Sequence, residues 1–156
     1  MKLSDFVIQK AIVPNLESTD RDGVINELID ALVAAGCGDA EVRDTLVKQI
    51  IDREKKGSTG FGKGVAVPHV KHETIKSMAA AIGVSHKGID FNALDKEPVY
   101  SVMLLLSPLD KPDEHLQAME NIFANLQKDT FRRFLKQATT VDAVTDLLHE
   151  ADTQQI

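Results

Sequence analysis

The chain has 156 residues, enough for one domain with its own core, and its 43% apolar and 27% charged residues are ordinary for a globular protein. Its net charge of −6, with no clustered Lys/Arg stripe, argues against nucleic acid as a partner. Because it has no signal-peptide core, no membrane-length apolar run and a single cysteine (Cys37), we expect a cytoplasmic protein with no direct membrane insertion.

The first third of the chain predicts a short strand followed by two helices. The apolar stretch from Ala11 to Val13 indicates an edge strand or a lead-in. Apolar residues at helical spacing predict a helix that begins at Thr19 and ends at Gly36. A second helix is expected from Asp39, with Arg53 at the edge of its apolar stripe. A glycine-rich segment follows directly.

The middle of the chain predicts strands. Val65 to Val67 is a short run that stiffens the backbone, and Met78 to Val84 and Val99 to Leu106 are continuous apolar runs. Such runs are typical of strands covered on both faces of a sheet. Turn residues at 87–90 and 95–98 are expected to separate the last two strands.

The last third predicts three helices. Pro112 suits a first helical turn, and Asp129 and Thr140 are expected to cap two further helices. One α/β domain over residues 1–151 accounts for the whole pattern, and residues 152–156 are expected to form a frayed tail.

His69 is the strongest candidate for a reactive residue. It ends a glycine-rich stretch from Gly57, and Pro68 before it fixes the local backbone. A flexible, donor-rich loop that leads into a fixed histidine suits acceptance of a phosphoryl group on imidazole. The stretch from Gly57 to Lys63 also fits the start of a P-loop. A nucleotide site is disfavoured, however, because Gly64 lacks the hydroxyl that holds Mg²⁺ and the expected order of helix and strand is reversed.

Five other residues are candidates for holding a phosphoryl group. His115, at a helix start where imidazolium is disfavoured, can donate an N–H as a neutral ring. Arg53 offers a bidentate contact, and the loop offers Ser58, Thr59 and the backbone of Gly60. The structural alternatives stay open: a polar helix start for His115, a surface ion pair for Arg53 and turn capping for the loop.

A metal site is the alternative for the HxxH spacing of His69 and His72. Zinc needs three or four ligands, and no further ligand stands at a recognised spacing. Two residues three apart on an extended segment also point to opposite faces. We therefore expect no metal and no other cofactor. His86 and His149 are expected at the surface.

With these residues in this order along the chain, the sequence resembles the enzyme IIA domains of the phosphotransferase system (PTS), in the mannitol/fructose (type 2) and nitrogen-regulatory class. The resemblance covers nearly the whole chain. Its markers are Arg53, Ser58 to Gly62, Gly64 to His69, Gly88 to Phe91, Pro98-Val99, Leu104 to Pro108 and His115-Leu116.

The resemblance implies a single mixed β-sheet flanked by helices and a transferase that carries a phosphoryl group. It implies that His69 accepts the group from the phosphocarrier protein HPr or its nitrogen-branch relative, and that His115 and Arg53 help to hold it. Val70 and Phe61 depart from the usual residues of the family, and we expect such changes to alter partner fit rather than chemistry.

Three functional roles follow from the resemblance. Since the sequence holds one domain and no fused sugar-binding or IIB-like segment, we expect a stand-alone nitrogen-regulatory IIA. The first alternative is a stand-alone sugar-transport IIA that passes the group to a IIB component. The second is a binding module that has lost phosphorylation, which the presence of both histidines and Arg53 disfavours.

Overall fold

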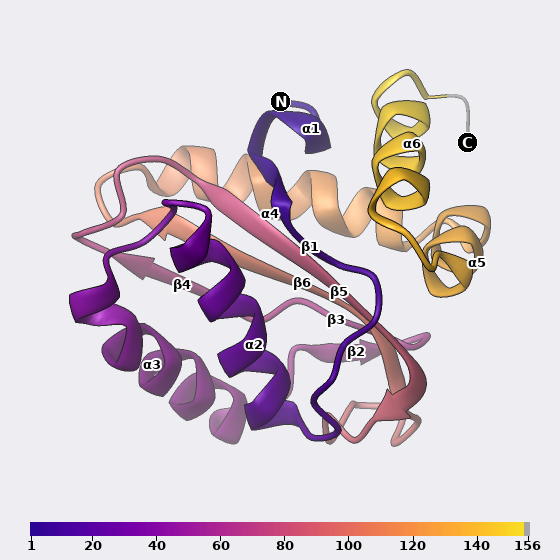
Figure 1. The fold of residues 1–156 in the computed structure, drawn as a ribbon, viewed down its shortest axis with the longest axis horizontal. Helices are drawn as coiled ribbons and strands as arrows, with labels where there is room; N and C mark the ends of the chain where they lie inside the picture. The colour runs from indigo at the N-terminus through magenta and orange to yellow at the C-terminus, as the bar shows by residue number, and fades with distance from the viewer. Residues whose placement is uncertain (155–156) are drawn as a thin grey trace.

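The structure, a computed structural model, describes residues 1–154, in which helices pack on both faces of a six-stranded sheet (Figure 1). Its strands are β1 (Val7–Val13), β2 (Gly60–Gly62), β3 (Val65–Ala66), β4 (His69–His72), β5 (Ala79–Ile89) and β6 (Val99–Pro108). Its helices are α1 (Leu3–Phe6), α2 (Arg21–Ala34), the 3-10 helix η1 (Ala40–Val42), α3 (Arg43–Lys56), α4 (Pro112–Leu126), α5 (Asp129–Gln137) and α6 (Val141–Asp152).

The sheet is mixed, which confirms the expected α/β class. Its order is β1-β5-β6-β3-β2; β1 runs parallel to β5, and β5 runs antiparallel to β6. Both β3 and β4 lie parallel to β6, one after the other along the same edge. The break between them falls at Pro68, which has no backbone N–H to donate. His69 therefore enters the sheet directly after this break, paired with Leu105.

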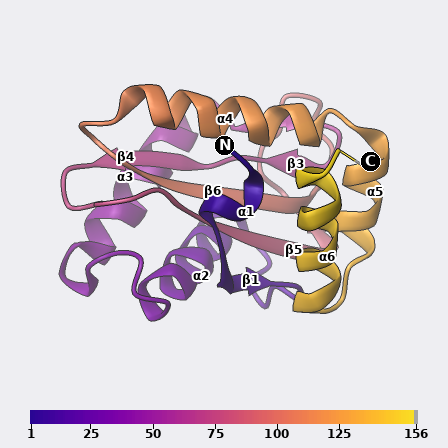
Figure 2. The ribbon, with the colours of Figure 1, turned by 90° about the horizontal axis from the view of Figure 1, so that it is seen from above.

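The two faces of the sheet carry separate apolar clusters. Helices α2 and α3 cover one face, and α1, α4, α5 and α6 supply the buried residues of the other. In Figure 1, α2 and α3 lie in front of the sheet and α4 behind it, and Figure 2 shows α1 beside α6. The core of β6, from Val102 to Leu106, is fully buried, as predicted for a strand covered on both sides.

Most predicted elements are confirmed, and the corrections concern their ends. The helix predicted from Thr19 begins at Arg21, because the side chain of Asp20 caps it by accepting the N–H of Gly23. Asp39 caps η1, and α3 starts only at Arg43. Asp129 is the first residue of α5 rather than its cap.

Two segments predicted as turns or loops are strands. β5 continues to Ile89, into the turn expected at 87–90, because Gly88 takes a φ of +88° and lets the strand bend without ending. Gly60–Gly62 pairs with β3, although glycines disfavour a strand. The edge strand predicted at Ala11 to Val13 is the second half of β1.

The C-terminal helices match the expectation closely. Thr140 caps α6 by accepting the N–H of Ala143, and α6 extends to Asp152, the first residue of the expected tail. The last two residues of that tail, 155–156, lie outside the described residues. Within residues 1–154, no helix combines the length and the apolar character that a membrane crossing needs.

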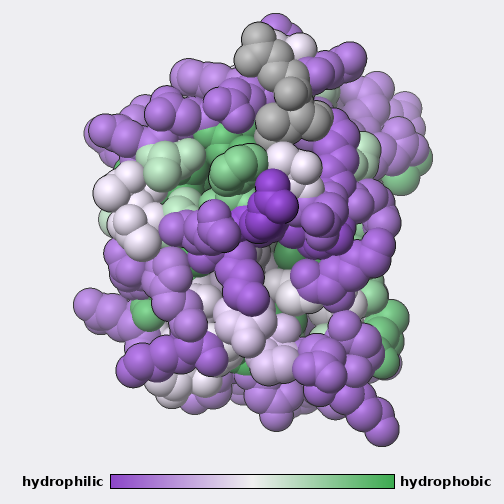
Figure 3. Space-filling view, turned by 90° about the vertical axis from the view of Figure 1, so that its right-hand side faces the viewer, coloured by the Kyte–Doolittle hydropathy of each residue, from purple (hydrophilic) through white to green (hydrophobic). Residues whose placement is uncertain are grey.

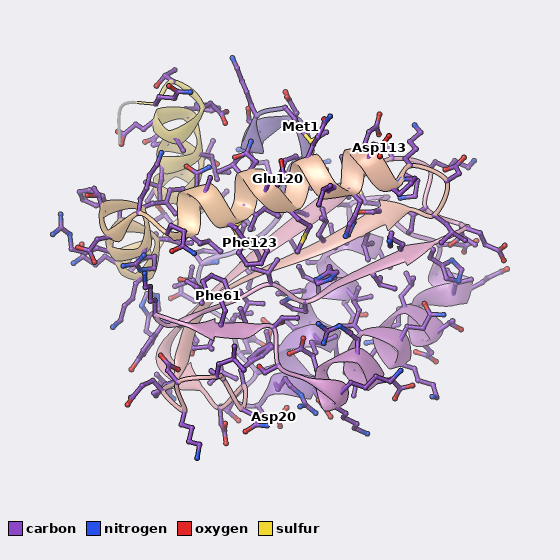
Figure 4. All side chains as sticks on the ribbon, turned by 180° about the vertical axis from the view of Figure 1, so that it is seen from behind. Met1, Asp20, Phe61, Asp113, Glu120 and Phe123 are labelled. Atoms are coloured by element: carbon purple, nitrogen blue, oxygen red, sulfur yellow. The ribbon has the colours of Figure 1, made fainter. Side chains whose placement is uncertain are left out.

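Helix α4 begins at the position that the sequence predicts. Pro112 is its first residue, where the missing N–H costs nothing, and Asp113 and Glu114 favour the positive end of the helix dipole. Figure 4 shows Asp113 where α4 starts, beside the ends of β4 and β6. This start brings His115 over the same end of the sheet as His69.

Candidate functional site

His69 is held in one tautomer by its own backbone neighbourhood. Its Nδ1 lies 2.8 Å from the carbonyl oxygen of Val67, and a carbonyl can only accept. Nδ1 therefore carries the hydrogen in the neutral ring, and Nε2 keeps its lone pair. The side chain is half-buried at the start of β4, so the ring is oriented and still reachable.

The segment before His69 is anchored on both sides. The N–H of Val67 donates to the carbonyl of Thr59 at 3.3 Å, and the carbonyl of Pro68 accepts from Leu105 at 3.0 Å. The glycine-rich strand β2 also packs tightly against Ala93, where a residue with a side chain does not fit. A Cβ on Gly60 would lie 3.0 Å from the Cβ of Ala93.

His115 lies beside His69, as the resemblance implies. Their ring centroids are 5.5 Å apart, with the planes tilted by 48°. His115 is buried, and its Nδ1 is 2.6 Å from the hydroxyl of Ser107, the next-to-last residue of β6. We call His69, His115, Ser107 and Lys71, described below, the histidine site.

His115 is neutral at pH 7. Burial above all, then electrostatic repulsion from His69 and from Lys71, lowers the pKa of His115 from 6.5 to about 4. The sequence predicted a neutral ring from the helix N-terminus, whereas burial is the main cause here. A neutral ring can donate one N–H and accept at the other nitrogen.

Lys71 is a member of the histidine site that the sequence did not single out. It stands two residues after His69, so both side chains leave the same face of β4. It also pairs with Ser107 of β6, whose hydroxyl contacts His115. The extended segment expected at residues 69–72 already places Lys71 on the same face as His69, but the sequence analysis applied that alternation only to His72.

Arg53 lies where α3 meets the glycine-rich loop. It is exposed, and its Nη1 donates to the carbonyl of Gly57 at 2.6 Å, which satisfies a free carbonyl at the helix end. Helix α3 also contacts β4, the strand of His69. The present contact of Arg53 is thus with the loop.

The hydroxyl of Ser58 and the N–H of Gly60 are engaged within the loop. The Ser58 hydroxyl donates to the carbonyl of Phe91 at 2.8 Å and accepts the Gly60 N–H at 2.9 Å. This is the turn-capping alternative that the sequence left open for Ser58.

Thr59 differs from its two neighbours. Its hydroxyl oxygen is buried and has no hydrogen-bond partner within residues 1–154. Its backbone N–H donates at 3.1 Å to the carboxylate of Glu54, which is only 3% exposed. The sequence missed Glu54, because a charged residue near a helix end is normally solvated. The loop thus keeps one unsatisfied hydroxyl, next to the backbone that holds His69.

The other histidines stand apart from this site. Nδ1 of His72 is 2.8 Å from the hydroxyl of Thr74. His86 and His149 are exposed, as predicted. In the described part of the chain, no three His, Cys, Asp or Glu side chains come together to hold a metal ion.

Two residues that depart from the family pattern pack into the fold. Phe61 of β2 contacts Phe123 of α4, with ring centroids 5.1 Å apart, and Figure 4 shows the two labelled side chains facing one another. Val70 packs against the apolar cluster of α2 and α3, on the face away from His115. Neither residue blocks the histidine pair.

A sequence model of the phosphoenolpyruvate-dependent sugar phosphotransferase system, EIIA 2, matches residues 6–151. The chain belongs to this family. It is 30% identical over 152 residues to the fructose-specific EIIABC component of Bacillus subtilis, matching 97% of this chain and 24% of that protein. The chain therefore spans about a quarter of that relative.

Relatives of similar length carry two kinds of name. The PTS fructose-specific EIIA component of Haloferax volcanii is 32% identical over 130 residues, 83% of each chain. The nitrogen regulatory protein of Pseudomonas aeruginosa is 34% identical over 111 residues, 71% of this chain and 72% of that protein. Sequence similarity thus places this EIIA chain near both groups.

Solved structures of this family share the fold. The nitrogen regulatory protein IIA-Ntr of Neisseria meningitidis has a TM-score of 0.82 at 25% identity, covering 94% of this chain and 98% of that one. Enzyme IIAMTL of Escherichia coli, in its complex with phosphorylated enzyme IIBMTL, has a TM-score of 0.76 at 21% identity, covering 90% and 94%.

Proposed function

We propose that this EIIA chain accepts a phosphoryl group on Nε2 of His69 from an HPr-type phosphohistidine protein, with residues 1–151 acting as one domain. The observation that carries the proposal is the 2.8 Å hydrogen bond from Nδ1 of His69 to the carbonyl of Val67. It leaves the Nε2 lone pair free to act as a nucleophile.

In the proposed step, a bond forms between Nε2 of His69 and phosphorus while the N–P bond of the donor breaks. The donor imidazole keeps the electron pair of the broken bond. The transition state is loose, with negative charge on the three equatorial oxygens. The step needs no metal ion, because imidazole is already a good nucleophile and a good leaving group.

Groups around His69 can stabilise that charge. The Ser107 hydroxyl would donate to Nδ1 of His115, so that the Nε2–H of the neutral His115 ring donates to a phosphoryl oxygen. Lys71 adds a positive charge from the same strand face. We also assign the unpaired hydroxyl of Thr59 and the guanidinium of Arg53 to this role, the latter after it leaves Gly57.

We further propose that the downstream role is regulatory, as in the nitrogen regulatory relatives. The IIA-Ntr structure from Neisseria meningitidis and the Pseudomonas aeruginosa relative support it. The second candidate is sugar transport, which the fructose-specific relatives support. In that role the group would pass to a IIB component, the kind of partner seen with enzyme IIAMTL.

The test of the acceptor is incubation with phosphoenolpyruvate, enzyme I and an HPr-type donor. We expect one acid-labile phosphate on the wild-type chain and none on His69→Ala, with His72→Ala as the matched control that labels normally. Label on His69→Ala at the wild-type rate would show that another residue is the acceptor.

A second measurement separates the two roles. The phosphorylated chain is mixed with a fructose-type IIB component, and label on IIB is followed with time. Under the regulatory role the phosphohistidine should persist. Rapid transfer to IIB, dependent on His69, would assign the chain to sugar transport instead.

A further inference from the structure

A second cationic feature lies at the other end of the sheet. A cavity of about 420 Å³ opens between α5, the turn at Lys63 and Gly64, and the start of β6. It is on the same face of the sheet as His115, because α4 and α5 share one apolar cluster. Ser101 in its lining is four residues from Leu105, the partner of His69, and four strand residues span about 13 Å.

One face of α5 supplies most of the charge around this cavity. Its lining residues follow helical spacing, which turns them all toward the opening: Asp129, Arg132, Arg133 and Lys136. Arg132 is held by the carbonyl of Leu126 at 2.8 Å and by Asp129 at 3.2 Å. Figure 3, which views the end of the molecule that carries α5 and α6, shows hydrophilic residues around a hydrophobic patch in its upper part.

Three cations of the cavity are not neutralised by carboxylates. Within residues 1–154, Lys63, Arg133 and Lys136 form no ion pair with an acidic side chain. The carboxylate of Asp95, which also lines the cavity, accepts the backbone N–H groups of Lys63 at 3.1 Å and Glu97 at 3.0 Å. Glu97 also lines the cavity, so its four cations face three carboxylates, an excess of one positive charge in a chain of net charge −6.

The lining of the cavity also includes a serine. Ser101 is only 2% exposed, and its backbone N–H donates to the carbonyl of Gly64 at 3.1 Å. Because Ser101 lines the cavity, its hydroxyl can donate a hydrogen bond to a bound ligand. The ammonium of Lys136 lies 3.9 Å from the centre of the Tyr100 ring, a cation–π contact that holds it over the opening.

We propose that this group, the α5 cavity of Lys63, Tyr100, Ser101, Arg133 and Lys136, binds a small anion with two or more negative charges. Phosphate-bearing and carboxylate-bearing molecules share this chemistry, and charge-assisted hydrogen bonds to Arg and Lys hold either. The volume falls in the usual range of small-molecule sites, ~300–1,000 Å³. The site is separate from the histidine site and does not depend on phosphoryl transfer.

The test uses the full chain carrying His69→Ala, so that phosphoryl chemistry plays no part. Backbone NMR shifts are followed while inorganic pyrophosphate, and in a separate arm citrate, is added at constant ionic strength. We expect saturable shifts at Tyr100, Ser101 and the α5 amides. If only pyrophosphate saturates the shifts, the ligand is phosphate-bearing. If only citrate does, the ligand is carboxylate-bearing. If both do, the cavity recognises the negative charge that the two anions share.

Variants locate the binding. Arg133→Gln with Lys136→Gln should weaken it about tenfold, and Ser101→Ala should weaken it several-fold. The matched control is Lys10→Gln with Lys76→Gln, which changes the net charge equally at two exposed lysines outside the cavity. Melting temperatures identify any variant that has lost its fold. Absence of saturation in both arms, or equal weakening by the control pair, overturns the proposal.

Discussion

The histidine site and the α5 cavity lie on one face of the same sheet and are built in opposite ways. The histidine site uses short contacts that orient rings: 2.8 Å from His69 to Val67, and 2.6 Å from His115 to Ser107. The α5 cavity uses exposed side chains, Arg133 and Lys136, around one buried hydroxyl. Forming a covalent bond needs one atom in a fixed direction, whereas binding an ion tolerates mobile cations.

The comparison depends on His69 and His115 acting together in phosphoryl transfer. Replacing His115 by Ala should slow phosphorylation of His69 by on the order of 10²–10³, because one oriented donor to the transition state is lost. The measurement is the rate of acid-labile phosphate uptake, with His149→Ala as the exposed control. Label on His115 in the wild type would exchange the two roles.

The burial of His115 should also make the free energy of unfolding depend on pH. The unfolded ring takes up a proton near pH 6.5 and the folded one near pH 4, so the unfolded chain binds more protons in between. The free energy of unfolding should therefore fall by about 3 kcal/mol as the pH drops from about 6.5 to 4.

Denaturant unfolding at several pH values measures this fall. His115→Gln should flatten that part of the curve, and His149→Gln, at an exposed position, should not. An unchanged slope in His115→Gln would mean that another group causes it.

Substitutions of Lys71 test whether the histidine site also relies on a mobile cation. Lys71→Gln should slow phosphorylation about tenfold, and Lys71→Arg should restore most of the rate. Because the Lys71 charge helps to lower the pKa of His115, Lys71→Gln should also raise that pKa. Transfer rates and an NMR titration of His115 measure both effects. Wild-type values in both for Lys71→Gln would make Lys71 an ordinary surface residue.

Arg53 should give the smallest effect of the series. Arg53→Lys keeps the charge but loses the planar fork, so phosphorylation should be slower and the phosphohistidine shorter-lived, with little change in melting temperature. Arg53→Ala should be slower still and lose about 1 kcal/mol of stability with the bond to Gly57. A large melting loss in both variants, with normal transfer, would make Arg53 structural. Neither variant should alter anion binding at the α5 cavity.

Much of the fold could be predicted from the sequence because its signals are local. Apolar spacing predicted α2 and α4, continuous apolar runs predicted β5 and β6, and Pro112 and Thr140 marked helix starts. The ends of the helices and strands were predicted less accurately. Asp20 competes with Thr19 for the cap, and a single glycine at 88 can bend a strand as easily as end it.

The sequence by itself determined His69 as the candidate acceptor, since the glycines and the proline that prepare it are its neighbours in the chain. Only the tertiary structure decided the rest of the site. Parallel pairing of β4 on β6 sets Lys71 beside Ser107, and the start of α4 buries His115 beside His69. The α5 cavity likewise joins three segments that lie about thirty residues apart in the chain, and no local pattern encodes such contacts.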